Sequence, residues 1–301
     1  MIYVCIQPDI SYFHWQIEVM LSSFQQVGVD LQKCHIVLLY EDKQSDWSYK
    51  IKEKYSQINI WCYKDERDKK HYPPSIKPYG MSIFLKHNKE FENENIFYHD
   101  SDIILIEKVN EKLFEDKSCW YLSDTISYIG FNYIESKGEK QAEEIFDFFG
   151  ISKQVVRKNQ ENSGGAQYVI NNTNHFFWEK VYKDSNDLYD FLNEKEKGFV
   201  GRYPIQKWCA EMWSTLWNAW LCNIETRIVK ELDFCFATDK ISDLKDKKIV
   251  HNAGVVCEDK EKMFFKGDYI SIFPNQINIP KNIDQSYCSF LYLKQLKKVI
   301  K

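Results

Sequence analysis

The sequence predicts an α/β fold in which helices cover both faces of a mostly parallel sheet. Short apolar runs alternate with helical patterns through the first half of the chain, and this alternation favours parallel pairing of the strands. The 301 residues are 44% hydrophobic and include only 11 glycines and 7 prolines. The chain can therefore bury a sizeable core and does not fall in the disordered or low-complexity classes.

The first half contains four apolar runs that are typical of strands, separated by segments with helical spacing. The expected elements, in chain order, are a strand at Ile2–Gln7, a helix with Phe13, Ile17, Leu21 and Phe24 on its apolar face, strands at His35–Tyr40 and Ile58–Tyr63 on either side of a polar helix near 45–57, a helix at about Pro78–His87, and a strand at Ile96–His99.

The second half is less regular. The expected elements are an amphipathic helix at 139–149 closed by Gly150, a strand at Ala166–Ile170, helices at His175–Tyr182 and Trp208–Cys222, short strands near 233–236, 249–251 and 269–272, and a basic apolar helix at Tyr287–Lys301. We expect the last helix to dock a partner or a surface through its lysines, with a purely structural role as the equal alternative.

Charge and cysteine content restrict the function classes. Forty basic and 44 acidic residues give a net charge of −4, which argues mildly against a protein whose main task is to bind nucleic-acid phosphates. The nine scattered cysteines contain no C-x-x-C pair, so they fit neither a zinc site nor a disulfide scaffold. Reduced thiols are typical of a cytoplasmic chain.

The sequence does not suggest a signal peptide or a membrane span. The apolar run at the N-terminus meets Pro8 and Asp9 at once and has no basic segment before it, unlike a signal peptide. No window approaches the ~20 apolar residues of a membrane span. We therefore expect a soluble, cytoplasmic protein without integral membrane association.

The sharpest motif is IFYHDSDIIL, in which Asp100 and Asp102 lie between two apolar runs. Two carboxylates at such a turn are unfavourable unless a cation or hydrogen bonds compensate them. Oxygen ligands of this kind suit Mg²⁺ or Mn²⁺, which keep positions open for substrate phosphates. An ordinary polar turn after a strand is the alternative.

With two further segments, this motif resembles the GT-A glycosyltransferases, which use nucleotide-diphospho-sugars. Asn162–Asn171 (NSGGAQYVIN) is similar to a segment of the glycogenin-like and hydroxyproline O-arabinosyltransferase-like enzymes, as is Ile249–Gly254 (IVHNAG) followed by Phe264–Gly267 (FFKG). The interval before the lysine is longer than in those families, and Gly-Asp replaces their Pro-Trp. The resemblance implies a Rossmann-like GT-A fold with a smaller acceptor-side lobe.

The resemblance covers roughly residues 1–270 and implies several roles. We expect a nucleotide-sugar-binding half at 1–130, an acceptor-side half at 131–270, and a C-terminal extension with a basic helix at 271–301. Asp100, Asp102 and His251 would bind the metal, Mn²⁺ or Mg²⁺, and Lys266 would meet the donor diphosphate. A core histidine bonded to backbone is the alternative for His251.

The Gly-Gly turn would let backbone approach the donor sugar closely. We expect Asn162, Gly164 and Gly165 to contact the donor and Gln167 to take part in catalysis through its hydrogen bonds; a plain turn opening a strand is the alternative. Glu211 is a candidate general base or acceptor-orienting group. It shares a helix face with Trp208 that would meet an acceptor, whereas a solvated glutamate is equally consistent.

Polar residues near the predicted strand ends are further candidates for donor contacts. Ligands of parallel sheets bind beyond the carboxyl ends of the strands, although polar residues there also serve solubility alone. The candidates are Gln7, Asp9, Ser75, Lys77, Ser101 and Asp124.

With these residues, the resemblance implies a metal-dependent glycosyltransferase that moves a sugar from a nucleotide-diphosphate donor, for preference a UDP-sugar, to a hydroxyl of a glycan, a protein or a modified nucleobase. A sugar-1-phosphate nucleotidyltransferase is one alternative, although the first strand lacks the Gly- and Arg-rich loop that it would need. A carbohydrate- or nucleic-acid-binding module without catalysis is the other.

Overall fold

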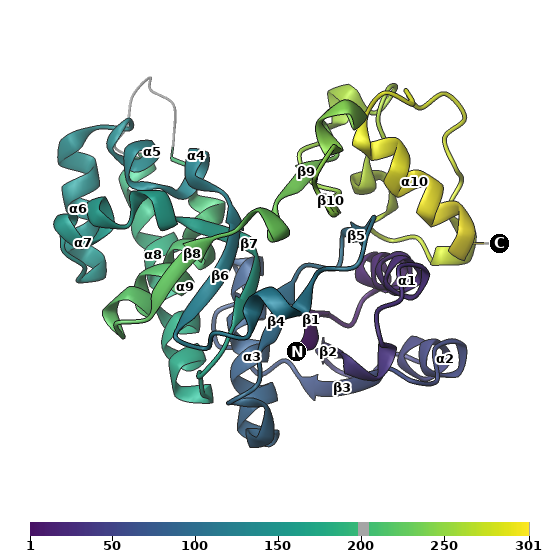
Figure 1. Ribbon diagram of the computed structural model, residues 1–301, viewed down its shortest axis with the longest axis horizontal. Helices are drawn as coiled ribbons and strands as arrows, with labels where there is room; N and C mark the ends of the chain where they lie inside the picture. The colour runs from purple at the N-terminus through teal and green to yellow at the C-terminus, as the bar shows by residue number, and fades with distance from the viewer. Residues whose placement is uncertain (198–204, 301) are drawn as a thin grey trace. The chain divides into compact units, whose positions relative to one another are not determined.

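The computed structural model describes residues 1–197 and 205–300. It divides into two compact units that interleave along the chain (Figure 1). Unit 1 consists of Met1, Glu66–Tyr98 and Lys112–Val229, and unit 2 consists of Ile2–Asp65, His99–Glu111 and Lys230–Lys301. These limits do not follow the expected boundaries at residues 130 and 270, so that division into halves stays a prediction. Lys301 of the expected last helix lies outside the described residues.

Unit 2 is built on three parallel strands. β1 (Ile2–Pro8) pairs with β2 (Cys34–Tyr40), which pairs with β3 (Asn59–Lys64). The helices α1 (Ser11–Gln26) and α2 (Trp47–Lys54) connect these strands in turn. β1 and β2 are buried along almost their whole length, which is why both read as continuous apolar runs rather than as alternating ones.

A second, smaller sheet in unit 2 joins distant segments. β10 (Ile249–His251) pairs antiparallel with β5 (Ile103–Leu105) and parallel with β9 (Phe234–Phe236). The last helix, α10 (Cys288–Val299), packs against α1. Tyr292 and Leu296 of α10 belong to one buried cluster with Trp15 and Val19 of α1.

In unit 1, β4 (Ile96–His99) and β6 (Cys119–Asp124) both pair antiparallel with β7 (Gly164–Ile170), and β8 (Glu225–Ile228) adds to β6 in parallel. α3 (Ile76–His87) and α9 (Ala210–Leu221) both pack on the long helix α8 (His175–Lys197). The remaining helices are α4 (Ile126–Ile129), α5 (Phe131–Glu135), α6 (Glu139–Phe149) and α7 (Lys153–Lys158).

The expected α/β class with mostly parallel strands and flanking helices is confirmed. The helix predicted at 139–149 is found with those bounds and ends at Gly150, whose φ of 79° is the left-handed conformation that glycine adopts at helix ends. The strand expected near 269–272 is wrong: a 3₁₀ turn, Lys266–Tyr269, occupies this part of the chain. Here burial of Phe264 and Tyr269 in the α1–α10 cluster replaces strand pairing.

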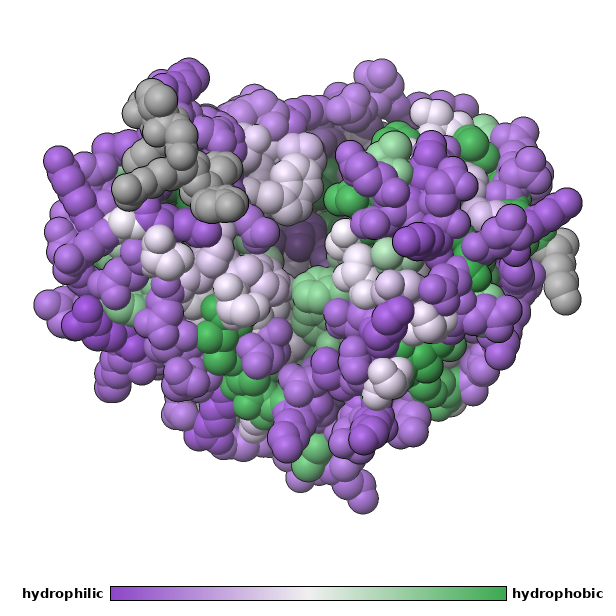
Figure 2. Space-filling view, turned by 90° about the horizontal axis from the view of Figure 1, so that it is seen from above, coloured by the Kyte–Doolittle hydropathy of each residue, from purple (hydrophilic) through white to green (hydrophobic). Residues whose placement is uncertain are grey.

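The helix expected at His175–Tyr182 continues to Lys197, because buried residues go on recurring at helical spacing through Leu188 and Leu192. Within the described ranges, no helix combines the length and apolar character needed to cross a membrane. Figure 2 shows hydrophilic residues over most of the face in view, with hydrophobic ones in small separate groups.

Candidate active site

Asp100, Asp102 and His251 come together in unit 2 through strand pairing. The two aspartates occupy the turn between β4 and β5, and His251 is the last residue of β10. His251 lies opposite Ile103 in the antiparallel register of β10 and β5. The Asn252 N–H also donates to the Asp102 carbonyl oxygen (2.8 Å). The pairing thus brings a histidine from late in the chain beside the aspartate turn.

The three side chains offer a compact set of metal ligands. One ligand atom from each lies within 4.8 Å of the other two. The His251 Nε2 is 3.2 Å from the Asp102 Oδ1 and 3.8 Å from the Asp100 Oδ2. Asp102 and His251 are buried and Asp100 is half-buried. Two carboxylates and an imidazole fit Mn²⁺ or Mg²⁺, which bind oxygen ligands and tolerate a nitrogen.

Lys266 adds a positive charge to this group. Its Nζ forms an ion pair with the Asp102 Oδ2. Burial of the Asp102 carboxyl by itself would raise its pKa, but Lys266 and His251 outweigh burial and hold this pKa well below its usual range. Burial likewise opposes the charge of Lys266, yet Asp102 leaves the pKa of Lys266 raised. Asp102 is therefore an anion at neutral pH.

Tyr12 also lies within electrostatic reach of Lys266 and Asp102. Burial raises the pKa of the Tyr12 phenol. The charge of Lys266 opposes this rise, and the charge of Asp102 adds to it. No motif in the sequence marks Tyr12, because it lies on α1 and reaches the site only through the packing of unit 2. It is one neighbour of the site that sequence reasoning missed.

Gln7 and Asp9, the predicted donor contacts at the end of β1, are buried by residues of unit 2. The Asp9 Oδ1 binds the His14 Nε2 (2.7 Å) and the Ser45 hydroxyl (2.5 Å), and its Oδ2 accepts the Ser45 N–H (2.7 Å). Trp47 stacks on the His14 ring at 4.3 Å. Gln7 is buried beside them in β1. The carboxylate of Asp9 thus holds the loop that follows β2.

Ser101, between the two aspartates, is fully buried. Its hydroxyl lies 3.5 Å from the Gln16 Oε1 on α1. The structure places this side chain toward α1, and its expected contact with the donor stays a prediction.

The Gly-Gly pair lies in β7 of unit 1, where a side chain would not fit. A Cβ at Gly164 would be 2.5 Å from the Leu122 Cβ, and a Cβ at Gly165 would be 2.6 Å from the Met212 Cε. The register of β6 and β7 shifts between Leu122 and Ser123, and the next residue, Ala166, has a φ of 65°. Close packing within unit 1 is a sufficient reason for both glycines.

The other predicted residues on this side of the fold lie in unit 1. Gln167 is buried, and its Oε1 accepts the Ser123 hydroxyl (3.0 Å). The exposed Asp124 accepts the Ile126 N–H (3.0 Å), which satisfies the start of α4. The Asn162 carbonyl accepts the Thr226 hydroxyl (3.1 Å). Their expected contacts with the donor, and catalysis by Gln167, stay predictions.

Lys77 and Glu211, predicted separately, form an ion pair at 3.1 Å in unit 1. Glu211 is buried in the first turn of α9, where the positive end of the helix dipole favours its charge. Ser75 lies just before α3, and its hydroxyl donates to the Tyr72 carbonyl (2.8 Å). Trp208 is exposed whereas Glu211 is buried, so the two side chains do not form one exposed helix face, and their expected contact with an acceptor stays a prediction.

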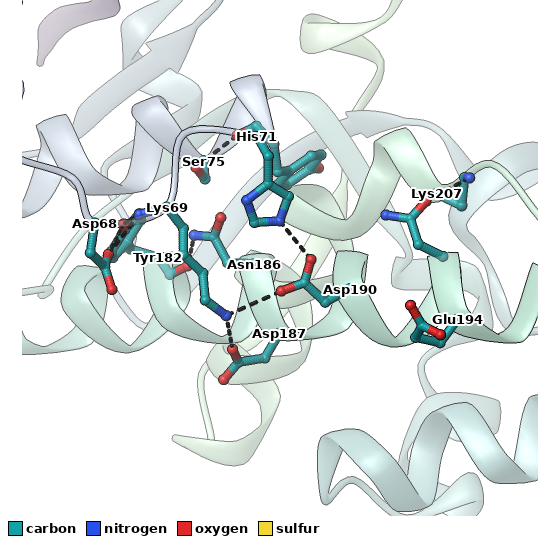
Figure 3. Close-up of polar contacts among 12 residues, drawn as sticks. Asp68, Lys69, His71, Ser75, Tyr182, Asn186, Asp187, Asp190, Glu194 and Lys207 are labelled. Atoms are coloured by element: carbon teal, nitrogen blue, oxygen red, sulfur yellow. Dashed lines mark hydrogen bonds and ion pairs between the residues drawn. The ribbon is translucent and has the colours of Figure 1, made fainter.

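A polar network on the surface of unit 1 has no counterpart in the predictions. Lys69 binds Asp187 (2.9 Å) and Asp190 (3.1 Å) on α8, and His71 binds the other oxygen of Asp190 (2.6 Å), as Figure 3 shows. The Tyr182 hydroxyl donates to Asp68 (2.6 Å). The spacing of Asp187 and Asp190 on one helix face was a signal, but their partners come from the segment after β3, far away in the sequence.

Comparison with known proteins identifies the fold. No family model and no curated protein matches the chain. Among solved structures, the apo bifunctional glycosyltransferase WbbM aligns with a TM-score of 0.50 at 11% identity over 85% of this chain, which spans 46% of WbbM. An active-site mutant of LgtC aligns with the same score and identity over 100% of this chain and 97% of LgtC. The chain has a GT-A-like glycosyltransferase fold.

Proposed function

We propose that this chain is a metal-dependent glycosyltransferase that transfers a sugar from a nucleotide-diphosphate donor, a UDP-sugar for preference, to a hydroxyl acceptor. The observation that carries the proposal is the convergence of Asp100, Asp102 and His251 within 4.8 Å. The GT-A-like fold supports it, because the aspartate turn follows a strand of that fold. The acceptor hydroxyl would belong to a glycan, a protein or a modified nucleobase.

Asp100, Asp102 and His251 would hold Mn²⁺ or Mg²⁺ in this proposal. When bound, the ion supplies a Lewis acid that stabilises the negative charge of a departing nucleoside diphosphate. Lys266 contacts Asp102, and its ammonium group would bind a phosphate oxygen of a diphosphate held by the ion. The lysine would thus orient the donor.

Further residues are proposed to contact the sugar and the acceptor. Asn162, Gly164, Gly165 and Asp124 are proposed to contact the donor. We assign Gln167 and Glu211 to the catalytic and acceptor side. The ion pair with Lys77 holds the Glu211 carboxyl in one position, which suits an orienting role.

A thermal-shift measurement with UDP tests the proposal. UDP is expected to stabilise the protein only when Mn²⁺ or Mg²⁺ is present, because the diphosphate needs a cation to approach two aspartates. At ~100 times its dissociation constant, UDP should raise the free energy of unfolding by about 2.7 kcal/mol. Asp102→Asn should lose this effect, whereas Asp246→Asn, at an exposed position of the same unit, should keep it. Equal stabilisation in EDTA would contradict the proposal.

A donor-hydrolysis assay separates the alternatives. The proposed enzyme releases UDP slowly from a UDP-sugar when water replaces the acceptor. A nucleotidyltransferase would instead exchange pyrophosphate with a nucleoside triphosphate, and a binding module would do neither.

A further inference from the structure

We propose that Trp208 is a platform for a pyranose ring of the acceptor, and hence that the acceptor is a glycan rather than a peptide or a nucleobase. This inference deepens the proposed function and rests on it in one respect: the bound sugar is taken to be the acceptor of the proposed transferase. The saccharide-binding surface itself is argued from unit 1 alone.

Trp208 presents a large aromatic surface to solvent. It is 61% exposed, whereas the three tryptophans of α9 are buried in the core: Trp213, Trp217 and Trp220. Removing an apolar ring from water is favourable, so an exposed indole on a folded unit is a site where a ligand with an apolar face gains affinity. Tryptophan is also the residue type most enriched where binding energy concentrates.

The platform is fixed in position before any ligand arrives. The Tyr72 hydroxyl donates to the Trp208 carbonyl (2.6 Å), and the Tyr72 and Trp208 rings meet edge to face with centroids 6.1 Å apart. Tyr72 in turn stacks on Tyr189 of α8 at 4.3 Å. An anchored ring loses little conformational entropy on binding.

Half-exposed polar groups adjoin Tyr189, at the other end of the aromatic group formed by Trp208, Tyr72 and Tyr189. The His71 ring lies 6.1 Å from the Tyr189 ring and binds Asp190, which shares Lys69 with Asp187 (Figure 3). The side chains of these four polar residues are between 38% and 48% exposed. Their carboxylates and nitrogens can form charge-assisted hydrogen bonds with hydroxyl groups.

A pyranose matches this combination better than the other acceptors do. One face of a sugar ring carries C–H groups that pack on an aromatic face, and the hydroxyls of a glycan can bond to the carboxylates and the lysine near Tyr189. The surface carboxylates of Asp187 and Asp190 would repel the phosphates of a nucleic acid. A peptide would need a longer apolar groove. In the described part of unit 1, the exposed apolar surface at this place is the single Trp208 indole.

Tyr72 also links the platform to the proposed acceptor-side residue. The same hydroxyl that donates to Trp208 accepts the Glu211 N–H (2.8 Å). Trp208 and Glu211 are thus held through one side chain at the start of α9. A sugar stacked on Trp208 would therefore lie at the start of α9, the helix whose first turn carries Glu211.

The test is binding of the full-length protein to a printed array of glycans with hexose, hexosamine and pentose termini, in the absence of donor and metal. The array also carries hydroxylated peptides and hydroxymethylated oligonucleotides. The best-bound glycan is then studied by saturation-transfer NMR and titrated into each variant. Trp208→Ala is expected to weaken binding roughly tenfold or more, and Trp208→Phe to restore most of it. Phe176→Ala, which removes an aromatic ring of 66% exposure on α8, is the matched control and should bind as the wild type.

Two results would support the inference. Saturation transfer to the C–H protons of the sugar should be lost in Trp208→Ala, and the same variant should show a raised acceptor KM in the transfer assay. Absence of any bound glycan, equal affinity in Trp208→Ala with an unchanged melting temperature, or Trp208-dependent binding of the peptides or oligonucleotides instead would overturn it. Glycan binding that depends on Trp208 in a protein without UDP release would refute the proposed enzyme and leave the saccharide site standing.

Discussion

Asp9 shows how a side chain at a strand end can serve its own loop. Both carboxylate oxygens are engaged, one by His14 and the Ser45 hydroxyl and the other by the Ser45 N–H. Burial of the carboxyl would raise its pKa, but the bonds from His14 and Ser45 outweigh burial and lower it. Asp9 therefore stabilises the folded state as an anion.

Asp9→Asn is expected to lower the free energy of unfolding by about 2 kcal/mol at pH 6, because buried donors lose a charged acceptor. The pKa of Asp9 is lower in the folded state than in the unfolded state, where it is about 3.9. The stabilisation is therefore complete above the unfolded pKa and is lost as the pH falls through the folded pKa. Urea denaturation of both proteins at pH 6 and pH 3 should show the gap between them shrinking at pH 3. Asp42→Asn, at an exposed position nearby, is the control, and a gap independent of pH would contradict the assignment.

Lys266 occupies the position of a competing cation at the aspartate turn, because it contacts Asp102. Lys266→Met is expected to tighten Mn²⁺ binding in the absence of nucleotide roughly tenfold, or ~1.4 kcal/mol at 25 °C, since the carboxylates lose their internal counter-charge. The same change should weaken UDP binding in the presence of Mn²⁺. Isothermal titration measures both, with the exposed Lys260 changed to Met as the control. Unchanged Mn²⁺ affinity would mean that Lys266 and the ion do not compete.

At the scale of elements, α10 belongs to the core. Its residues Cys288, Tyr292, Leu293 and Leu296 are buried with residues of α1, while Lys294, Lys297 and Lys298 are exposed. The structure therefore favours the structural alternative for this helix over a role limited to docking, because the lysines are the outer face of an amphipathic helix.

Leu296→Ala should destabilise the protein by about 2–5 kcal/mol, because it opens a cavity between α10 and α1. Lys297→Ala should change stability by no more than about 0.5 kcal/mol. Thermal or urea denaturation compares the two. If Leu296→Ala is as stable as Lys297→Ala, then α10 is not part of the core.

Across the whole molecule, burial divides the nine cysteines into distinct classes. Cys222 and Cys257 are exposed, Cys62 is half-buried and the other six are buried. Burial raises the pKa of Cys34 and of Cys209 to about 12, which suppresses their reactive thiolates.

A thiol-specific chromogenic reagent should therefore modify two thiols rapidly in the native protein, and all nine after unfolding in urea. The double variant with Cys222→Ser and Cys257→Ser should lose the rapid phase. Rapid modification of further thiols in that variant would show that the units open more readily than their burial implies.

Much of the fold follows from local patterns. Apolar runs and helical spacing predict β1, β2, α6 and α9 to within a few residues, because burial of a strand on both faces gives a continuous apolar run and burial of one helix stripe gives a helical period. The aspartate turn after β4 could also be predicted, because two carboxylates separated by one residue between apolar strands are unfavourable without a compensating partner.

The sequence by itself thus determined the α/β class, the carboxylate pair and, through a resemblance, the candidate histidine. Only the tertiary structure decided which distant residues meet. Pairing of β10 with β5 brings His251 beside Asp102. Packing within unit 2 brings Lys266 into an ion pair with the same carboxylate, and the Ser45 hydroxyl donates to Asp9. Each of these contacts depends on strand register or on packing between elements far apart in the chain. Periodicity describes which face of an element is buried and carries no information about its partner.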